Sequence, residues 1–222
     1  MRDLGLRPRP DVPLRVLCLG AHSDDIEIGC GGLILDLARN HPATSVDWIV
    51  FSGNAARARE ARAGARLFLN GLRRPRVALH TFRDGFFPHD GAAIKLVFEK
   101  VKRAIPAPDL ILTHYRDDRH QDHRVISDLT WNTFRDHLVL EYEIPKYDGD
   151  LGAPNCYVAL DRETCDRKAA YLMKAFGSQR DRHWFSEETF LGLMRVRGVE
   201  CRAPHGYAEA FYARKLVMST AR

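Results

Sequence analysis

Short apolar runs that alternate with helical patterns constrain this chain of 222 residues more than any other feature. Five runs have the length and composition of buried strands: Arg15–Gly20, Val46–Phe51, Arg76–Phe82, Asp109–Thr113 and Val139–Ile144. Strands that alternate with helices build right-handed βαβ units, which assemble into a parallel sheet covered on both faces. The sequence therefore predicts a doubly wound, Rossmann-like α/β fold with a mostly parallel sheet and helices on both faces.

Apolar spacing and chain-breaking residues give approximate helix positions. Four helices are expected among these strands, at about 24–40, 54–69, 94–105 and 125–138. After a Pro/Gly-rich loop at 145–154 we expect a short strand at Tyr157–Leu160, two helices, and a last strand near Ala210–Val217. This length fits one domain over residues 1–222, with 1–14 as a loosely ordered N-terminal segment.

The composition excludes several classes of protein. No apolar run approaches the ~18 residues of a membrane span, and the basic, proline-interrupted N-terminal segment lacks the apolar core of a secretory signal. Five scattered cysteines without a CxxC pair indicate reduced thiols, so we expect a cytoplasmic protein. The net charge of +5 is spread over interleaved basic and acidic residues, which argues against a nucleic-acid partner.

Histidines and carboxylates follow the first and the fourth predicted strands. His22, Asp24 and Asp25 come directly after the first strand, and His120 and His123 come after the fourth. In a doubly wound sheet these strands are neighbours, and ligands bind beyond their carboxyl ends. Residues three apart on a turn that enters a helix can converge on one point. The segments could supply three N/O ligands and an open position, as catalytic zinc sites do; Mn, Fe(II) and Co are also compatible.

Structural roles exist for single members of this set. Asp24 and Asp25 suit the first turn of a helix, and an isolated histidine at a strand end is usually structural. Gly29, Gly31 and Gly32 lack the full register of a phosphate-binding loop, and the preceding acids would repel a pyrophosphate. Close packing of the helix on the sheet explains these glycines better. Two His/Asp groups on adjacent strand ends nevertheless favour a metal site.

The two motifs resemble those of a known enzyme family. The segment His22–Asp25 (HSDD) is similar to the HPDD motif of the PIG-L/LmbE-type zinc-dependent N-deacetylases, and His120–His123 (HQDH) is similar to their HxDH segment. The apolar strand before the first motif, the glycine run after it and the stretch Tyr207–Phe211 resemble family members as well. The similarity extends from about Arg15 to Lys215, with Ser23 where proline is usual.

The resemblance implies a zinc site with an adjacent general base. In this interpretation His22, Asp25 and His123 bind one zinc ion per chain, and Asp24 is the base. Zinc lowers the pKa of a bound water from 15.7 toward ~7, so a nearby carboxylate can take its proton near neutral pH. A zinc-activated water would then attack an acetamide carbonyl.

The remaining site residues also take their roles from the resemblance. His120 would stabilise the oxyanion or protonate the leaving amine, and Asp122 would orient His120. Arg57 and Glu60 resemble an R-x-x-E pair near the substrate, although a surface ion pair is an equal alternative. Asp84 matches an acid that faces sugar hydroxyls, or is a simple turn residue.

The resemblance thus implies a hydrolase that removes an N-acetyl group from an amino sugar or sugar conjugate. Its partner would be that small molecule, and the sequence leaves a homo-oligomer open. One alternative is a metal-dependent phosphoesterase in which Asp117 and Asp118 help to hold a second ion. Another is a metal-free sugar- or nucleotide-binding module. Histidines outside the motifs, such as His114, are expected to be structural or rim residues.

Overall fold

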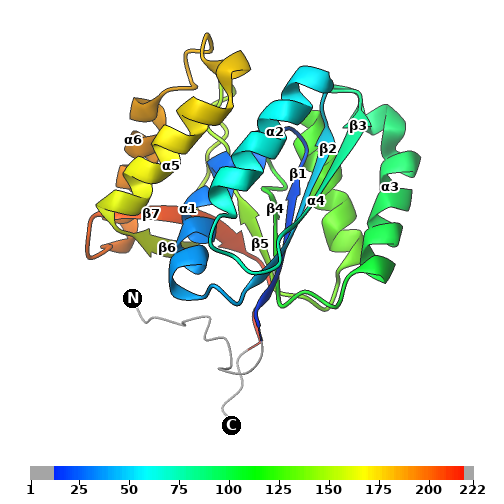
Figure 1. Cartoon of the computed structure of the whole chain (residues 1–222), viewed down its shortest axis with the longest axis horizontal. Coiled ribbons are helices and arrows are strands. Elements are labelled where there is room, and N and C mark those ends of the chain that lie inside the picture. Colours follow the sequence, from blue (N-terminus) through cyan, green and yellow to red (C-terminus); the bar gives the residue numbers. More distant parts are fainter. Residues whose placement is uncertain (1–12, 218–222) are drawn as a thin grey trace.

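A computed structural model describes residues 13–217, and its strands form a seven-stranded sheet (Figure 1). The strands are β1 (Arg15–Gly20), β2 (Ser45–Ser52), β3 (Arg76–Phe82), β4 (Leu110–His114), β5 (Val139–Tyr142), β6 (Cys156–Leu160) and β7 (Tyr207–Ala213). They lie in the order β3-β2-β1-β4-β5-β7-β6. Neighbours among β1 to β5 pair in parallel, whereas β7 pairs antiparallel with both β5 and β6. The predicted doubly wound, mostly parallel sheet is confirmed.

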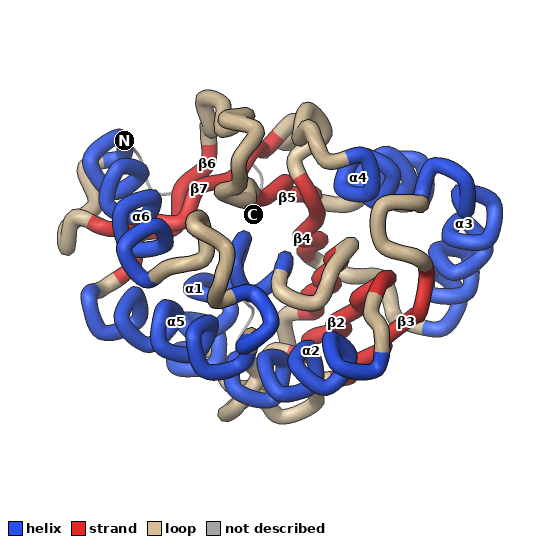
Figure 2. The backbone as a smooth tube through the Cα atoms, turned by 90° about the horizontal axis from the view of Figure 1, so that it is seen from above, coloured by secondary structure: helices blue, strands red, loops and turns tan. Residues whose placement is uncertain are grey.

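Helices cover both faces of this sheet (Figure 2). They are α1 (Asp25–Asn40), α2 (Ala55–Phe68), α3 (Phe87–Ala104), α4 (Gln121–Thr133), α5 (Arg162–Ala175) and α6 (Glu187–Cys201), with a 3-10 turn at Gly177–Gln179. On one face, α1, α2 and α5 enclose a buried apolar cluster that contains Trp48 and Phe68. On the other face, α3 and α4 enclose a second cluster that contains Phe51 and Phe98. These two layers hold the sheet from both sides.

Three element boundaries differ from the sequence-based expectation. Helix α3 begins at Phe87, well before the start expected at Ile94. Phe87 is buried seven residues before Ile94, but the residues between them, 88–93, are exposed or half-buried and include no large apolar side chain that would have extended the pattern. Helix α4 ends at Thr133, and the buried Phe134 follows the helix as its cap residue. Strand β7 ends well before Val217, whose side chain is 98% exposed.

Other expectations concern the termini, the cysteines and membranes. The predicted N-terminal segment 1–14 lies outside the described residues, apart from its last two positions. All five cysteines are unpaired, as the sequence suggested. Between residues 13 and 217, no helix has the length and apolar character needed to cross a membrane.

Helix α1 is interrupted at Cys30, where the backbone leaves helical geometry (φ −144°, ψ 17°). A buried ion pair compensates for this break. The Glu209 carboxylate accepts hydrogen bonds from the N–H groups of Gly32–Leu33 at 2.6 and 2.7 Å, in the part of the helix after the break. The Lys168 ammonium lies 2.7 Å from Glu209 and donates to the carbonyl of Ile28 before the break. The pair therefore satisfies backbone groups on both sides of the interruption.

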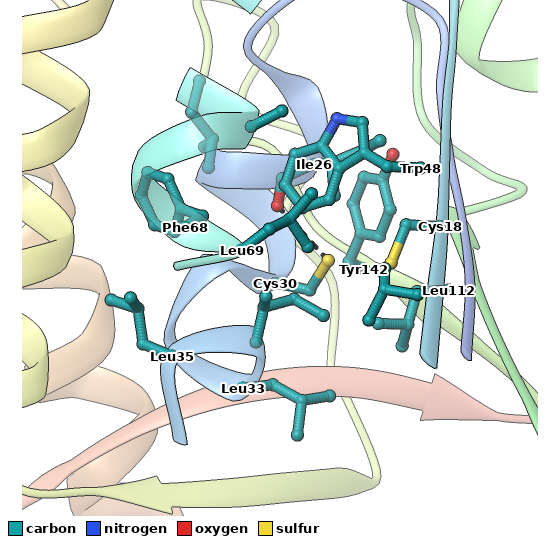
Figure 3. Close-up of a cluster of buried hydrophobic side chains, with 14 of the residues drawn as sticks. Cys18, Ile26, Cys30, Leu33, Leu35, Trp48, Phe68, Leu69, Leu112 and Tyr142 are labelled. Atoms are coloured by element: carbon teal, nitrogen blue, oxygen red, sulfur yellow. Dashed lines mark hydrogen bonds between the residues drawn. The ribbon is translucent and has the colours of Figure 1, made fainter. Parts of the chain in front are cut away.

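The first part of α1 lies very close to the sheet. A Cβ atom at Gly29 would come within 2.5 and 2.8 Å of ring atoms of Tyr142. That ring is fully buried in the cluster shown in Figure 3, and its hydroxyl donates to the carbonyl of Leu19 at 2.7 Å. Because the ring is fixed at both ends, it has little freedom to move aside. The close-packing interpretation of this glycine is confirmed.

We expect the substitution Gly29→Ala to lower the free energy of unfolding by about 1–3 kcal/mol, because the added methyl group overpacks the interface with Tyr142. Gly192→Ala is the matched control, since a Cβ there meets nothing within 4 Å. The control should unfold at the same or a slightly higher urea concentration than wild type. Urea denaturation of both variants checks this; equal stability of the two would contradict the packing argument.

Candidate metal centre

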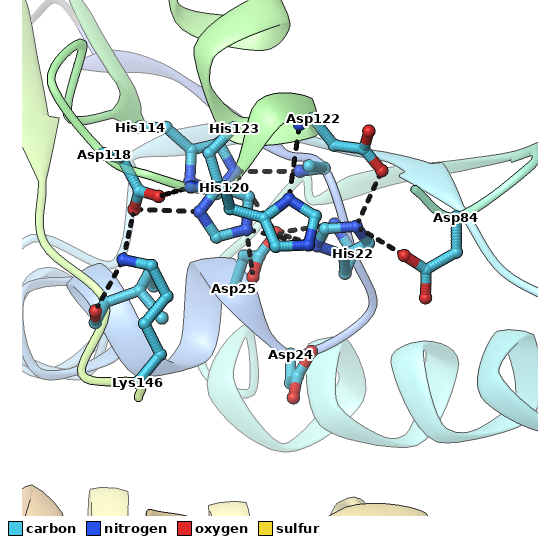
Figure 4. Close-up of polar contacts among 12 residues, drawn as sticks. His22, Asp24, Asp25, Asp84, His114, Asp118, His120, Asp122, His123 and Lys146 are labelled. Atoms are coloured by element: carbon cyan, nitrogen blue, oxygen red, sulfur yellow. Dashed lines mark hydrogen bonds and ion pairs between the residues drawn. The ribbon is translucent and has the colours of Figure 1, made fainter. Parts of the chain in front are cut away.

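The segments that follow β1 and β4 meet at the carboxyl end of the sheet (Figure 4). Asp24 occupies the N-cap position of α1 without a capping hydrogen bond from its side chain, whereas the ring of His120 caps the start of α4. Strands β1 and β4 are hydrogen-bonded neighbours, with Val16 beside Leu110. The predicted convergence of the two motifs follows from this topology.

Three side chains proposed as ligands lie within contact distance of one another. His22 Nδ1 is 3.2 Å from His123 Nε2 and 3.3 Å from one carboxylate oxygen of Asp25. The other oxygen of Asp25 is 3.5 Å from His123 Nε2. Tetrahedral zinc ligands, at about 2.1 Å from the ion, stand about 3.4 Å apart. All three side chains are at most 7% exposed. Their spacing therefore fits one zinc ion.

The second nitrogen of each imidazole faces a carboxylate. His22 Nε2 lies 3.2 Å from Asp122 Oδ2 and 3.1 Å from Asp84 Oδ1. His123 Nδ1 lies 2.9 Å from Asp118 Oδ2. An N–H directed at a carboxylate leaves the opposite nitrogen with a free lone pair. The nitrogens left free are the two that face each other, so the donor set suits a metal ion.

His120 lies beside the three candidate ligands with one nitrogen already occupied. Its Nδ1 accepts the N–H of Asp122 at 3.2 Å, which leaves the proton of the neutral ring on Nε2. Its ring centroid is 4.6 Å from that of His123 and 4.7 Å from that of His22. Burial, together with the neighbouring His123 and His22, lowers the pKa of His120 to about 4. Near neutral pH it is therefore an uncharged hydrogen-bond donor.

Asp24 faces Arg57 rather than the imidazoles. One arm of the Arg57 guanidinium is 3.2 Å from Asp24, and the other is 3.1 Å from Asp84. Burial and the adjacent Asp25 raise the pKa of Asp24, while Arg57 opposes that rise. The two residues proposed to face substrate thus pair with each other at the mouth of the site, where the Asp84 side chain is 53% exposed.

The expected alternative for Arg57 and Glu60, an ion pair on the surface of α2, does not form. Glu60 instead accepts the backbone N–H of Ser178 at 2.8 Å and its hydroxyl at 2.6 Å. Glu60 therefore ties α2 to the turn after α5. The spacing of Arg57 and Glu60 on α2 gave no indication of this contact, because Ser178 lies more than a hundred residues further along the chain.

Comparison with models of protein families shows the family to which the chain belongs. The model for PIG-L, described as GlcNAc-PI de-N-acetylase, matches residues 17–134, which is more than half of the chain and includes both motifs. The chain belongs to the PIG-L family. The resemblance inferred from the two motifs is therefore confirmed. No curated protein matches the sequence.

Solved structures share the fold of this PIG-L family member at low identity. The conserved protein TT1542 from Thermus thermophilus is 19% identical, with a TM-score of 0.70 over 94% of this chain and 99% of that one. N,N'-diacetylchitobiose deacetylase from Pyrococcus horikoshii is 20% identical, with a TM-score of 0.68 over 90% and 83%. GalB, a 4-carboxy-2-hydroxymuconate hydratase from Pseudomonas putida KT2440, is 18% identical, with a TM-score of 0.68 over 94% and 100%. At such identities the likeness establishes the fold alone.

Asp122 has a different neighbour from the one that the family resemblance implied. Its carboxylate contacts His22 and accepts the N–H groups of Gly85 and Phe87 at 2.7 and 3.1 Å. Only its backbone N–H reaches the ring of His120. Its side chain lies in the first turn of α4 and is directed at the β3–α3 loop. The expected contact from this carboxylate to His120 is therefore absent among the described residues.

His114 lies directly against the candidate ligands, in a structural role that agrees with the sequence-based expectation for histidines outside the motifs. It is fully buried at the end of β4, and its ring stacks on His123 with centroids 3.9 Å apart. Its Nε2 accepts the N–H of Ala21 at 2.9 Å and lies 3.2 Å from Asp25. Because this lone pair is occupied by the backbone, His114 supports Asp25 and His123 from behind instead of adding a ligand. Its position at the carboxyl end of β4, where the candidate site was expected, could have indicated from the sequence that His114 lies next to the site.

Asp118 also has a different environment from the expected one. One oxygen accepts the N–H of His120 at 2.7 Å, while the other contacts His123 and Lys146. Asp117 is 67% exposed and lies 3.6 Å from Arg214. The two acids considered for a second metal ion are therefore engaged elsewhere.

Replacing Asp25 tests the ligand set. We expect Asp25→Ala to lose zinc during dialysis, because the site then keeps only two of its three protein ligands. Asp117→Ala removes an exposed carboxylate from the segment between β4 and α4, and we expect both this variant and wild type to retain about one zinc ion per chain. Elemental analysis of the folded, dialysed proteins measures this. Equal zinc content in all three proteins would exclude Asp25 as a ligand.

Proposed function

We propose that this PIG-L family member is a zinc-dependent hydrolase that removes an N-acetyl group from an amino sugar or sugar conjugate. The observation that carries the proposal is the convergence of His22, Asp25 and His123 within 3.5 Å of one another. A neutral imidazole, His120, lies beside them, and the buried carboxylate of Asp24, the residue directly before Asp25, faces Arg57. N,N'-diacetylchitobiose deacetylase, which shares this fold, supports an acetamide as the substrate.

The metal would be held by His22, Asp25 and His123. When bound there, a zinc ion supplies Lewis acidity, which makes water a better nucleophile and polarises a carbonyl group. Asp122 and Asp118 would fix the orientation of the two imidazoles from behind, as carboxylates do around histidine ligands. Other divalent ions with a preference for N/O ligands remain chemically compatible.

Asp24 and His120 divide the proton chemistry in this proposal. Asp24 accepts a proton from the water that attacks the amide carbon, since it is buried, ionisable and directly precedes a ligand. The Nε2–H of His120 donates to the carbonyl oxygen as negative charge develops on it. The C–N bond then breaks, the proton taken by Asp24 passes to the leaving nitrogen, and acetate and a free amine are released. Both groups thus serve the transition state.

Arg57 and Asp84 would bound the substrate side of the site. Arg57 holds the base, while the half-exposed Asp84 is accessible to a sugar hydroxyl. The proposal takes the whole chain as one deacetylase domain in the cytoplasm that binds a small molecule and no nucleic acid. It applies equally to a single chain and to a homo-oligomer.

Acetate release from N-acetylated sugars tests the function. We expect the zinc-loaded protein to release acetate from N-acetylglucosamine or one of its conjugates, including nucleotide-linked sugars, and to lose this activity with a chelator. A coupled acetate assay and amine detection measure both products. Phosphate release from sugar phosphates is measured alongside. Zinc-dependent phosphate release without acetate would favour the phosphoesterase, and binding without turnover would favour the metal-free module.

The role of Asp24 is tested with Asp24→Asn. We expect this variant to keep its zinc and to lose at least about 10²-fold in kcat, because it lacks a proton acceptor. Asp36→Asn, at a half-buried acid further along α1 that pairs with Arg39, is the control and should behave as wild type. Zinc content and steady-state kinetics are measured on the same samples. Loss of zinc from Asp24→Asn, to the extent seen with Asp25→Ala, would overturn the division of roles.

A further inference from the structure

We propose that Lys146 is a positioning residue of the metal centre, which acts on the ligand His123 through Asp118. The inference rests on the metal site of the proposed function and concerns the chain segment that follows β5. Neither the sequence motifs nor their spacing points to this lysine, which lies beyond both of them.

Lys146 is largely buried between two carboxylates. Its ammonium nitrogen lies 3.0 Å from Asp118 Oδ2 and 2.5 Å from Asp150 Oδ2 (Figure 4). The side chain of Lys146 is 10% exposed, and those of Asp118 and Asp150 are 2% and 6% exposed. It also approaches the carbonyl of Ile144 at 3.4 Å. An ammonium at this depth is costly unless it is paired, so its partners define its position.

Asp118 connects Lys146 to the candidate ligand. The oxygen that contacts Lys146 is also 2.9 Å from Nδ1 of His123, and the second oxygen accepts the N–H of His120. The Lys146 ammonium and the His123 ring therefore meet at one carboxylate oxygen of a side chain that is only 2% exposed. An ionised carboxylate is the stronger acceptor, and it makes the opposite nitrogen of the imidazole a better ligand. The charge of Lys146 therefore supports the donor strength of His123 without contact with the metal.

The same contacts join two loops. Asp150 Oδ2 accepts the N–H of Arg119 at 2.7 Å in addition to its contact with Lys146. The segment after β5 is thereby fixed against the segment after β4, at the residues that precede His120. Removing Lys146 would leave Asp118 and Asp150 close together without the cation between them. The orientation of the Asp118 carboxylate and the charge around it would then change, and with them its hydrogen bond to His123.

Zinc affinity in a double-mutant cycle tests this proposal. The dissociation constant for zinc is measured by chelator competition for wild type, Lys146→Met, Asp118→Asn and the double variant. We expect Lys146→Met to raise the zinc Kd about 10–100-fold, as the loss of a group that orients a metal ligand typically does. If Lys146 acts through Asp118, the double variant should lose no more affinity than Asp118→Asn alone.

Two further variants make the test specific. Lys95→Met is the control, because Lys95 pairs with Glu99 on α3, away from the centre, and should leave the zinc Kd unchanged. Lys146→Gln keeps a polar side chain of similar length without the charge, and the same rise in Kd is expected, so the test stands if Lys146→Met folds poorly. Thermal unfolding of the metal-free proteins is recorded with each measurement.

A zinc Kd for both Lys146 variants within twofold of that of Lys95→Met would overturn the proposal. So would penalties for Lys146→Met and Asp118→Asn that add in full, because Lys146 would then act independently of Asp118. A wild-type protein that binds zinc but releases no acetate from any sugar would contradict the proposed function and leave the role of Lys146 intact. Wild type without zinc affinity would overturn both.

Discussion

Mutual compensation of buried charge is the constraint on which the rest of this structure depends. At the carboxyl ends of β1 and β4, carboxylates and imidazoles are packed at 3% exposure or little more, where an unpaired charge would be prohibitively costly. Each of His22 and His123 has a carboxylate on the side away from the other imidazole. The arrangement thus leaves two imidazole lone pairs and the Asp25 carboxylate directed at a common point, where a cation would complete the pairing.

A second buried ion pair positions this centre from a distance. Glu209 and Lys168 satisfy backbone groups on both sides of the break in α1, so the turn that begins with Asp25 can leave the axis of the rest of the helix. This explains why a stretch near the end of the chain, Tyr207–Phe211, shares the family resemblance although it supplies no ligand. Its glutamate acts on the first motif through the helix.

The sequence contained enough information for the sheet and the ligand cluster, but not for the contacts behind it. Alternation of strands and helices makes β1 and β4 neighbours, and that topology alone brings His22 and His123 together. The partner of Asp122 depends on where the β3–α3 loop lies, and Lys146 approaches Asp118 from beyond β5. Such contacts join segments whose relative placement no local pattern encodes. The start of α3 was missed because a single buried residue, Phe87, is separated from Ile94 by six residues that are exposed or half-buried, and one apolar residue makes no recognisable periodicity.

The fold is shared with a hydratase as well as with deacetylases, so the reaction must be decided by side chains within a few ångströms of the centre. Two consecutive residues show how the chain separates their roles. Burial would raise the pKa of Asp25, but His123, His114 and His22 lower it well below the usual range. Asp24 faces away from these imidazoles toward Arg57, and burial raises its pKa. One carboxylate is thus held ionised among the imidazoles, while its neighbour retains affinity for a proton. A turn that directs adjacent side chains to opposite partners therefore gives two consecutive carboxylates different environments, as the proposed roles of ligand and base require.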